Sequence, residues 1–380
     1  MKISFFGFWI FFFGFNLQLF AQAISGSQIR IPSSQVPFMT FTPDARSAAM
    51  GEAGVALSPD ANATYWNASK LAFAERDFGV SASYAPWFRS ITENKWLGYA
   101  SAYKKLGDRQ ALAVSVNYFD KWERYLQSPN SLTGGEYSSS ELAINGSYSR
   151  QLGKNFSIGI TLKYISSNLS DTIVLDAISL GPARTIAGDL SAYYRKEFKN
   201  VTAVENFTWS VGAVVSNFGN KINYGSGIGE NFLPTTLKIG TGLSFTTNKI
   251  HRFSFIADAS KLMTPTPEQA DMVVDKPLLK GIFGSFSDAP NGFREELQEV
   301  LIAVGAEYWY KDSFALRGGY HGENKYKGNR KFLTAGAGLY LFKNYGLDFA
   351  YLFPVHKDNV LSGTFRISAS VYLGKSEKGI

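Results

Sequence analysis

The sequence predicts an all-β fold, a transmembrane antiparallel β-barrel of about fourteen strands, on three observations. Stretches of roughly ten residues that alternate apolar and polar side chains recur from about Asp77 to Leu373, and ten residues is the length of a tilted strand that spans a membrane. The charges inside these stretches fall on the polar face. The connections between the stretches are alternately long and short.

The alternation is clearest in the stretch 155–165. Phe156, Ile158 and Ile160 fall on one face, and Ser157 and Thr161 fall on the other, because side chains alternate across a strand. The final stretch, 364–373, repeats the pattern. A soluble β-sandwich also alternates and is the alternative fold.

Every mid-strand charge lies on the polar face. Turning that face outward would place the basic residues in lipid, at a cost of about 2 to 4 kcal/mol each near the bilayer midplane, so it must point into the lumen. The predicted lumen charges are Glu141, Lys163, Asp189, Lys238, Asp258, Glu307, Arg317, Asp348 and Arg366.

The connections support the same topology, since outer-membrane barrels have short periplasmic turns and long outer loops. The long ones are near 86–94, 121–136, 169–184, 217–233, 263–299 and 321–330, and tight turns such as 106–108 and 152–154 lie between them. The strand boundaries allow about twelve to sixteen strands. Both termini are expected on the periplasmic side.

Composition narrows the chemistry. The 380 residues include no cysteine, which removes disulfides, thiol catalysis and cysteine metal sites. The net charge of +7 is dispersed and forms no basic stripe, so nucleic acid is not an expected partner. We expect no cofactor.

The chain is predicted to contain four segments. Residues 1–21 form a signal peptide with an apolar run from Ile3 to Phe20, cleaved after Ala21 or Ala23, although an uncleaved anchor is the alternative. Residues 22–75 form a plug, 76–374 the barrel with its long outer loop at 263–299, and 375–380 a C-terminal tail.

The segment 22–75 is too long for a linker and too irregular for a strand, so we expect it to fill the lumen. Its alanine-rich centre, 44–57, can form a short helix capped by Asp44, although Gly51 and Gly54 disfavour a helix there. The intermixed lumen charges suit a filled, hydrogen-bonded interior, with an open pore as the alternative.

Two segments of the chain carry distinctive motifs. The first comprises residues 41–56, FTPDARSAAMGEAGVA, with SPDA at 58–61 and YWNASK at 65–70; the second is 280–299, KGIFGSFSDAPNGFREELQE. Together they resemble the PorV family of the type IX secretion system. The chain departs from the family at Glu52, where Asp is common, and lacks the proline of the wider superfamily after Asn67. The plug motif consists of Pro43, Asp44, Arg46, Gly51, Gly54, Asp60, Trp66 and Asn67.

The resemblance implies a fourteen-stranded barrel of the fatty-acid-transporter type and no enzymatic activity. It implies an outer-membrane shuttle in a Bacteroidetes-type Gram-negative envelope, which binds the C-terminal signal domain of secreted proteins at the translocon. The implied partners are the translocon barrel, that signal domain, a signal peptidase-like surface attachment complex and outer-membrane lipids, with lipopolysaccharide as a candidate.

The long outer loop offers a physical basis for partner binding, because exposed aromatic side chains need a partner or a pocket. The candidate partner-binding residues are Ile282, Phe283, Phe286 and Phe293. After them, Asn291 can cap a short helix that carries Glu295 and Glu296 in its first turns. Three readings stay open: the aromatics form a lid over the barrel mouth, dock a partner, or admit a ligand.

Other chemistry is sparse. His251, His321 and His356 lie near different connections, without the geometry of a catalytic triad. The acidic loop residues match no calcium loop, and no metal site is expected. Aromatics at strand ends are expected to form an interface girdle: Trp87, Trp96, Trp122, Tyr310 and Tyr351.

A second function stays open, transport of hydrophobic small molecules of the long-chain fatty-acid transporter type. An apolar pocket at the outer mouth that continues into a gap in the wall would favour transport. A polar, filled lumen would favour the shuttle.

Overall fold

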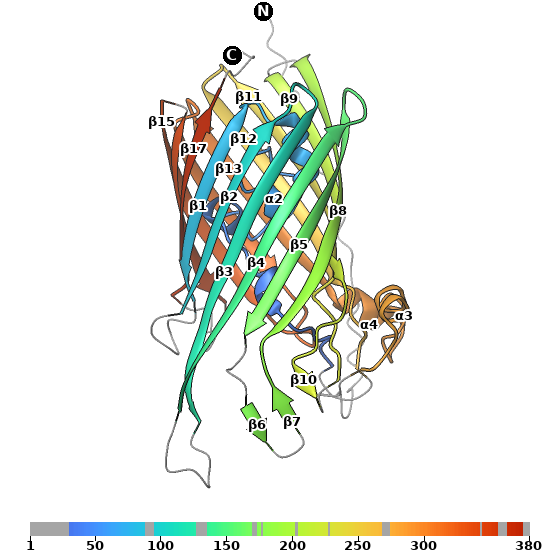
Figure 1. The fold of residues 1–380 in the computed structure, drawn as a ribbon. Helices are drawn as coiled ribbons and strands as arrows, with labels where there is room; N and C mark the ends of the chain where they lie inside the picture. The colour runs from blue at the N-terminus through green and yellow to red at the C-terminus, as the bar shows by residue number, and fades with distance from the viewer. Residues whose placement is uncertain are drawn as a thin grey trace, which may run out of the picture.

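The computed structural model describes residues 30–87, 95–126, 135–168, 173–175, 178–201, 204–226, 229–267, 274–342, 344–355 and 363–374. Within them, fourteen strands close into an antiparallel barrel, which confirms the predicted fold (Figure 1). The predicted signal peptide and C-terminal tail lie outside the described residues. The wall strands are β1 (Phe78–Pro86), β2 (Trp96–Lys105), β3 (Gln110–Leu126), β4 (Gly135–Gln151), β5 (Phe156–Asn168), β8 (Ala183–Val201), β9 (Val204–Gly219), β11 (Thr236–Thr247), β12 (His251–Leu262), β13 (Val300–Tyr310), β14 (Phe314–Gly322), β15 (Lys331–Leu341), β16 (Tyr345–Pro354) and β17 (Phe365–Leu373).

The barrel closes where β1 pairs with β17, in a register that runs from Phe78 opposite Leu373 to Tyr84 opposite Ile367. The strands follow the alternation in the sequence. In β5, for example, Ile158 and Ile160 are exposed on the outer wall whereas Thr161 is buried inside. None of the described helices is long and apolar enough to cross a membrane.

The two ends of the barrel differ. Short turns join the strands at the end where β1 begins and β17 ends. The other end carries a small sheet and two short helices (Figure 1). The sheet consists of β6 (Ile173–Leu175), β7 (Ile178–Leu180) and β10 (Gly225–Ser226), and the helices are α3 (Leu278–Gly284) and α4 (Phe293–Gln298).

The start of α4 corrects one expectation. The residue at its N-cap is Gly292, with φ 69° and ψ −157°, and not Asn291. Glycine adopts such a conformation without the steric cost of a side chain. Instead, the Asn291 N–H donates to Glu295 Oε2 at 3.0 Å. The hydrogen bond at the start of α4 is therefore made by the Glu295 side chain and not by the Asn291 side chain.

The N-terminal segment lies inside the barrel and contains η1 (Pro37–Thr40), α1 (Ala45–Ala48), α2 (Ala63–Trp66) and η2 (Ala68–Phe73) (Figure 1). As predicted, Asp44 caps the short α1, since its Oδ2 accepts the Ser47 N–H at 2.8 Å. The plug enters from the long-loop end, where the Gln35 N–H donates to the Phe232 carbonyl. It ends at the short turns, where Gln151 donates to the Ala72 carbonyl.

Arg30 and Gly374, the first and last described residues, therefore lie at opposite ends of the barrel. The Arg30 charge acts on Glu295 of α4, and Gly374 follows β17 at the short-turn end. The periplasmic position of both termini remains a prediction.

Glycines in the wall allow the plug backbone to lie directly against the strands. A Cβ atom at Gly319 would fall 2.1 Å from Gly51 N, and one at Gly305 would fall 2.5 Å from the Met50 carbonyl oxygen. We call this set the glycine seam: Gly212, Gly240, Gly242, Gly305, Gly319 and Gly336. The plug thus takes the place of wall side chains from β9 to β15, through its backbone at Gly212, Gly242, Gly305 and Gly319 and through Cβ atoms at Gly240 and Gly336.

Candidate functional site

The lumen charges of the sequence analysis lie on the inner face of the wall. All are buried except Lys238, which is half-buried with its ammonium 5.0 Å from the centre of the Trp66 ring. Most have a partner of opposite charge. Arg366 Nη2 lies 2.9 Å from Glu52 Oε1, and Arg317 lies between Glu307 and Asp348 at 2.8 and 2.7 Å.

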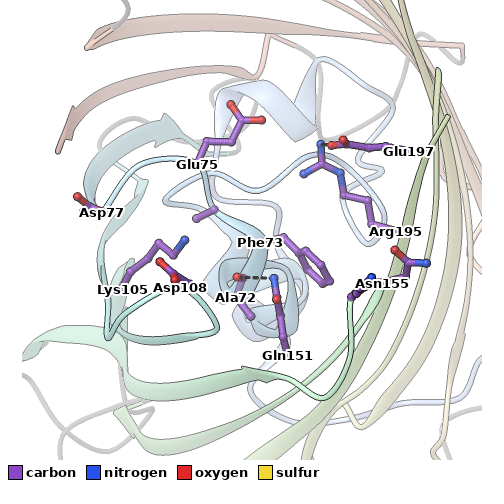
Figure 2. A pocket seen from close by; sticks show the side chains of 12 residues that line it. Ala72, Phe73, Glu75, Asp77, Lys105, Asp108, Gln151, Asn155, Arg195 and Glu197 are labelled. Atoms are coloured by element: carbon purple, nitrogen blue, oxygen red, sulfur yellow. Dashed lines mark hydrogen bonds and ion pairs between the residues drawn. The ribbon is translucent and has the colours of Figure 1, made fainter. Parts of the chain in front are cut away.

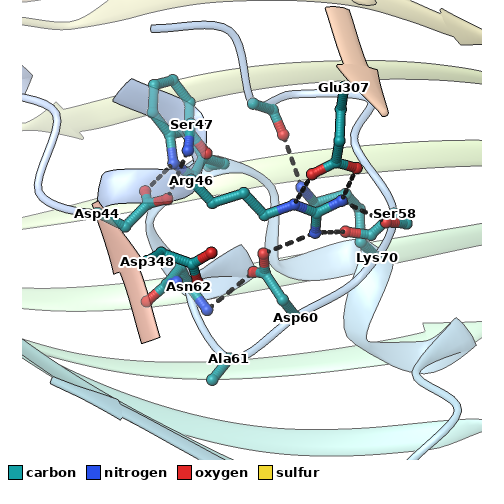
Figure 3. A network of polar contacts seen from close by, with 12 residues as sticks. Asp44, Arg46, Ser47, Ser58, Asp60, Ala61, Asn62, Lys70, Glu307 and Asp348 are labelled. Carbon is teal, nitrogen blue, oxygen red and sulfur yellow. Dashed lines mark hydrogen bonds and ion pairs between the residues drawn. The ribbon is translucent and has the colours of Figure 1, made fainter. Parts of the chain in front are cut away.

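Arg46 of the plug motif links the plug to the wall (Figure 3). Its guanidinium grips Glu307 of β13 through Nε and Nη2, both at 2.9 Å, and Nη1 reaches Asp60 at 3.0 Å. This bidentate geometry is the strong form of an arginine–carboxylate pair. Because Glu307 also accepts from Arg317, a charge network runs from the plug into the strands.

The remaining plug-motif residues hold the plug in shape. Trp66 Nε1 donates to Asp44 Oδ1 at 2.7 Å, and Asn67 Nδ2 donates to the carbonyls of Val55 and Ala192. Gly54 lies under the Trp66 ring, where a Cβ atom would fall 2.2 Å from Cδ2. Pro43 is buried, and the positive φ of Gly51 lets the chain turn against β14.

One plug residue was not among the candidates. Lys70 is buried, and its Nζ donates to the Gly54 carbonyl at 2.6 Å. The N–H groups of Gly54 and Val55 in turn donate to Asp258 Oδ2 at 2.7 and 2.9 Å. These bonds join the plug to β12. Lys70 ends the YWNASK segment of the resemblance, but a lysine outside any strand has no alternation that would place its side chain inside the barrel.

At the long-loop end the lumen becomes apolar and is filled by the chain itself. Val36, Phe38 and Met39 are buried in a cluster with wall residues such as Leu97 and Ile165. We call Val36 to Phe41 the inner stopper. Val36 adopts φ 59°, a region that is strained for a β-branched residue.

Trp87 corrects the expected girdle. It is only 4% exposed and stacks on Phe41 at a ring-centroid distance of 4.4 Å. The inner stopper gives this tryptophan an apolar partner inside the barrel. Tyr310, by contrast, is exposed on the outer wall, and the Trp122 side chain lies outside the part that the structure describes.

A bulge interrupts the wall between β8 and β9, where the register shifts between Gly188 and Leu190. Charged and polar side chains pack against the inner side of this bulge. Lys163 Nζ lies 2.8 Å from Asp189 Oδ2 and 2.8 Å from Asn217 Oδ1, and the Asn217 N–H donates to Asp189 Oδ1. Polar side chains therefore fill the inner side of the bulge.

A pocket of about 370 Å³ opens at the short-turn end (Figure 2). Its lining is mostly charged, with acidic and basic side chains intermixed, and Phe73 is its aromatic member. Arg195 and Glu197 form an ion pair at its edge. Such a lining offers little to a hydrophobic ligand.

The long outer loop exposes most of its candidate residues. Phe283, Phe286 and Phe293 are 64%, 42% and 75% exposed, and Leu279 and Leu297 are exposed beside them. In Figure 1, α3 and α4 project to one side of the barrel. The aromatics therefore do not form a lid over the mouth. We call these five residues the apolar loop face.

Ile282 differs from the expectation of an exposed side chain. It is fully buried and packs with Phe232 and Met263, while Gly281 lies against the Phe232 ring. On a short helix, one face must pack on the body for the other to be displayed. Ile282 thus anchors α3.

Buried ion pairs anchor α4. Lys327 Nζ lies 2.7 Å from Glu295 and 2.8 Å from Glu299, and Lys261 Nζ lies 2.9 Å from Glu296 and also pairs with Glu299. We call these five residues the loop clamp. Burial raises the pKa of Glu295, but the hydrogen bonds from Lys327 and the Asn291 N–H outweigh it and hold that pKa below its usual value.

The sequence did not point to the loop clamp as a unit. Lys261 ends β12 and Lys327 belongs to the connection between β14 and β15, so their partners on α4 are distant in the chain. The periodicity of α4 gave one signal: with Phe293 and Leu297 on the same face, Glu295 must face the other way.

The histidines take separate positions. His251 begins β12 beside the Tyr308 hydroxyl, and buried His321 stacks on Phe332 at 4.4 Å. His356 lies outside the described residues. Across the described ranges, no group of three or more His, Asp and Glu side chains could hold a metal ion.

A closed fourteen-stranded barrel, apolar outside and filled with a charged plug, defines an outer-membrane β-barrel of the plugged type. A family model described as type IX secretion system protein PorV matches residues 25–269, and the chain belongs to this family. No curated protein matches the chain.

Solved barrels share the fold. The Pseudomonas putida toluene transporter TodX superposes with a TM-score of 0.52 at 10% identity, covering 88% of this chain and 99% of TodX. The monoaromatic hydrocarbon channel CymD gives 0.51 at 14% identity, covering 91% of this chain and 100% of CymD. At such identities the likeness shows the fold alone.

Proposed function

We propose that this protein is an outer-membrane shuttle of the type IX secretion system. In this role it binds the C-terminal signal domain of secreted proteins at the translocon barrel and delivers them to the signal peptidase-like surface attachment complex. The long-loop end faces the cell surface and the short-turn end faces the periplasm. The proposed role requires no catalysis and no cofactor.

The apolar loop face carries this proposal. Five large apolar side chains are exposed at one end of the barrel, four of them on two short helices and Phe286 just after α3. A water-exposed surface on which several large apolar side chains lie together marks an interaction site. The loop clamp and Ile282 fix the two helices, so a partner would meet a pre-organised surface with a small entropy cost of ordering.

The filled lumen supports the shuttle over transport of hydrophobic molecules. The outer mouth is apolar, as a transporter would need, but the inner stopper occupies it. Below it, Arg46 and the glycine seam hold the plug against the wall. The bulge between β8 and β9 contains a buried ion pair, which suits a sealed wall better than a path for apolar ligands.

Affinity purification from the native outer membrane in mild detergent tests this function. The wild-type barrel should recover the type IX translocon barrel and secreted proteins that retain their C-terminal signal domains. The double variant Phe283→Ala with Phe286→Ala should lose most of this recovery while remaining folded, because aromatic anchors dominate binding energy at interfaces.

Phe349→Ala with Phe353→Ala provides the matched control. These phenylalanines are exposed on β16 of the outer wall, so the chemical change is the same and the apolar loop face is untouched. Unchanged recovery by the loop variant would contradict the proposal. A wild-type barrel that elutes alone with bound lipid would instead favour transport of hydrophobic compounds.

A further inference from the structure

The two helices of the long outer loop carry the same exposed pattern. On α3, Leu279, Lys280 and Phe283 are exposed, and the two residues before Phe283 are buried. On α4, Phe293, Arg294 and Leu297 are exposed, and Glu295 and Glu296 are buried. Each helix therefore presents an apolar residue, a basic residue and, four positions after the first, another apolar residue, so both helices offer similar chemistry.

The acidic side chains of this region are held away from that surface. Glu295, Glu296 and Glu299 turn toward Lys261 and Lys327 in the loop clamp. Asp288 lies 3.1 Å from Lys276 and also faces the Thr266 N–H. The carboxylates from Asp288 to Glu299 are thus partly or fully neutralised inside the loop.

The basic side chains show the opposite arrangement. Lys280 and Arg294 are exposed, and neither has an ion-pair partner among the residues that the structure describes. From Lys280 to Glu299 the charges are therefore separated: the acidic groups are paired inside the loop and the basic groups lie among the exposed apolar residues. Asp275, earlier in the loop, is exposed and pairs with Lys221 at 3.2 Å. The separation leaves a positive potential on an apolar surface.

We propose that the apolar loop face takes a folded protein domain whose contact surface is apolar at its centre and acidic at its rim. This inference rests on the proposed function and specifies the surface chemistry of the partner. Phe283, Phe286 and Phe293 supply the apolar contact, and Lys280 and Arg294 meet carboxylates at the edge. Rim charges of this kind act mainly on the association rate and on its salt dependence.

The fixed geometry favours a protein over a lipid surface as the partner. Insertion into a leaflet depends on apolar area and charge and does not require two helices held in one arrangement. Here, three buried carboxylates and two buried lysines fix α4, and Ile282 fixes α3. Recognition of a shaped protein surface benefits from this pre-organisation.

The test measures binding of an isolated C-terminal signal domain from a secreted protein to the purified full-length barrel in detergent. The variant Lys280→Glu with Arg294→Glu should weaken binding about tenfold at low salt and flatten its salt dependence, since rim charges steer association. Lys199→Glu with Lys249→Glu is the control, because these exposed lysines lie at the short-turn end and the change in charge is identical.

The outcomes separate this inference from the proposed function. In one outcome, Phe283→Ala with Phe286→Ala abolishes binding, but the loop charge-reversal variant binds with wild-type affinity at both about 0.05 M and about 0.5 M salt. The acidic rim of the partner is then wrong, and the proposed shuttle function stands. If neither variant changes binding, the apolar loop face is not the docking surface and the inference is overturned. If the wild-type barrel does not bind the signal domain, the proposed function fails as well. If charge reversal leaves binding intact and instead removes co-purifying lipopolysaccharide, the basic pair serves a lipid surface and the inference is overturned.

Discussion

Buried ion pairs anchor two regions of this barrel, with opposite results. In the lumen, Arg46 binds Glu307 and Asp60, and the surface of the plug is buried against the wall. At the long-loop end, Lys261 and Lys327 bind the carboxylates of α4, and the other side of the same loop displays five apolar side chains. The first arrangement fills the lumen, whereas the second leaves an apolar surface exposed.

The comparison indicates where function resides in this molecule. A buried ion pair contributes little net stability compared with apolar packing, but removing one partner is costly because the remaining charge is stranded. Such pairs therefore specify one geometry. In the lumen that geometry seals the barrel, and in the loop it orients the apolar loop face.

Loss of the plug anchor should have the largest effect. Arg46→Ala leaves Asp60 without its guanidinium partner and Glu307 with Arg317 alone, and it should reduce the free energy of unfolding by about 3 to 5 kcal/mol. The midpoint of the heat-induced mobility shift on detergent gels measures this change. Arg46→Lys keeps the charge but loses the two-pronged contact, so its midpoint should lie between those of wild type and Arg46→Ala.

An unchanged midpoint in Arg46→Ala would break the comparison, since the glycine seam and the other plug-to-wall bonds, such as those to Asp258 and Arg366, would then be sufficient to hold the plug. In that case the charge network of the lumen would be incidental to closure. A fall in midpoint for Arg46→Ala with an equal fall for Arg46→Lys would show that the fork geometry, and not the charge, is essential.

The inner stopper should give a smaller effect. Phe38→Ala removes a fully buried ring from the outer end of the lumen and should cost about 3 kcal/mol, because the surrounding wall cannot collapse into the space. It should also create an apolar cavity that binds the fluorescent probe N-phenyl-1-naphthylamine. Phe349→Ala, on the outer wall, is the control; equal midpoint and probe signals in the two variants would exclude a stopper role for Phe38.

The sequence predicted the barrel well because each strand has lipid on one face and a polar lumen on the other. Its own alternation of apolar and polar residues therefore shows which face is which. Thr161 and Ile160 illustrate this, since each faces the side that its chemistry requires. The capping role of Asp44 was also predictable, because a cap acts on the next few residues.

Contacts between distant segments were not predictable in the same way. Trp87 carried the signature of an interface aromatic, and its burial depends on Phe41, which reaches it only after the plug has folded into the lumen. In the sequence, Ile282 cannot be distinguished from its exposed apolar neighbours, because its burial depends on packing against the distant Phe232. The loop clamp joins strand β12 to two separate connections, and a local pattern reveals only its α4 side.

The loop clamp should respond to acid, and this gives the smallest and sharpest test of the comparison. Because the folded-state pKa of Glu295 lies below its usual value, its contribution to loop stability is present above the ordinary glutamate pKa of about 4.3 and is lost as pH falls further through the lowered pKa. Hydrogen exchange in residues 288–299, corrected for the intrinsic rate, should therefore show constant protection from about pH 7 to pH 5 and a decline below about pH 4. Lys327→Met removes the main hydrogen-bond donor to Glu295, so it should lower protection at neutral pH and weaken the acid response. If this variant keeps the full wild-type response, other carboxylates control the loop, and the parallel between Lys327 and Arg46 fails.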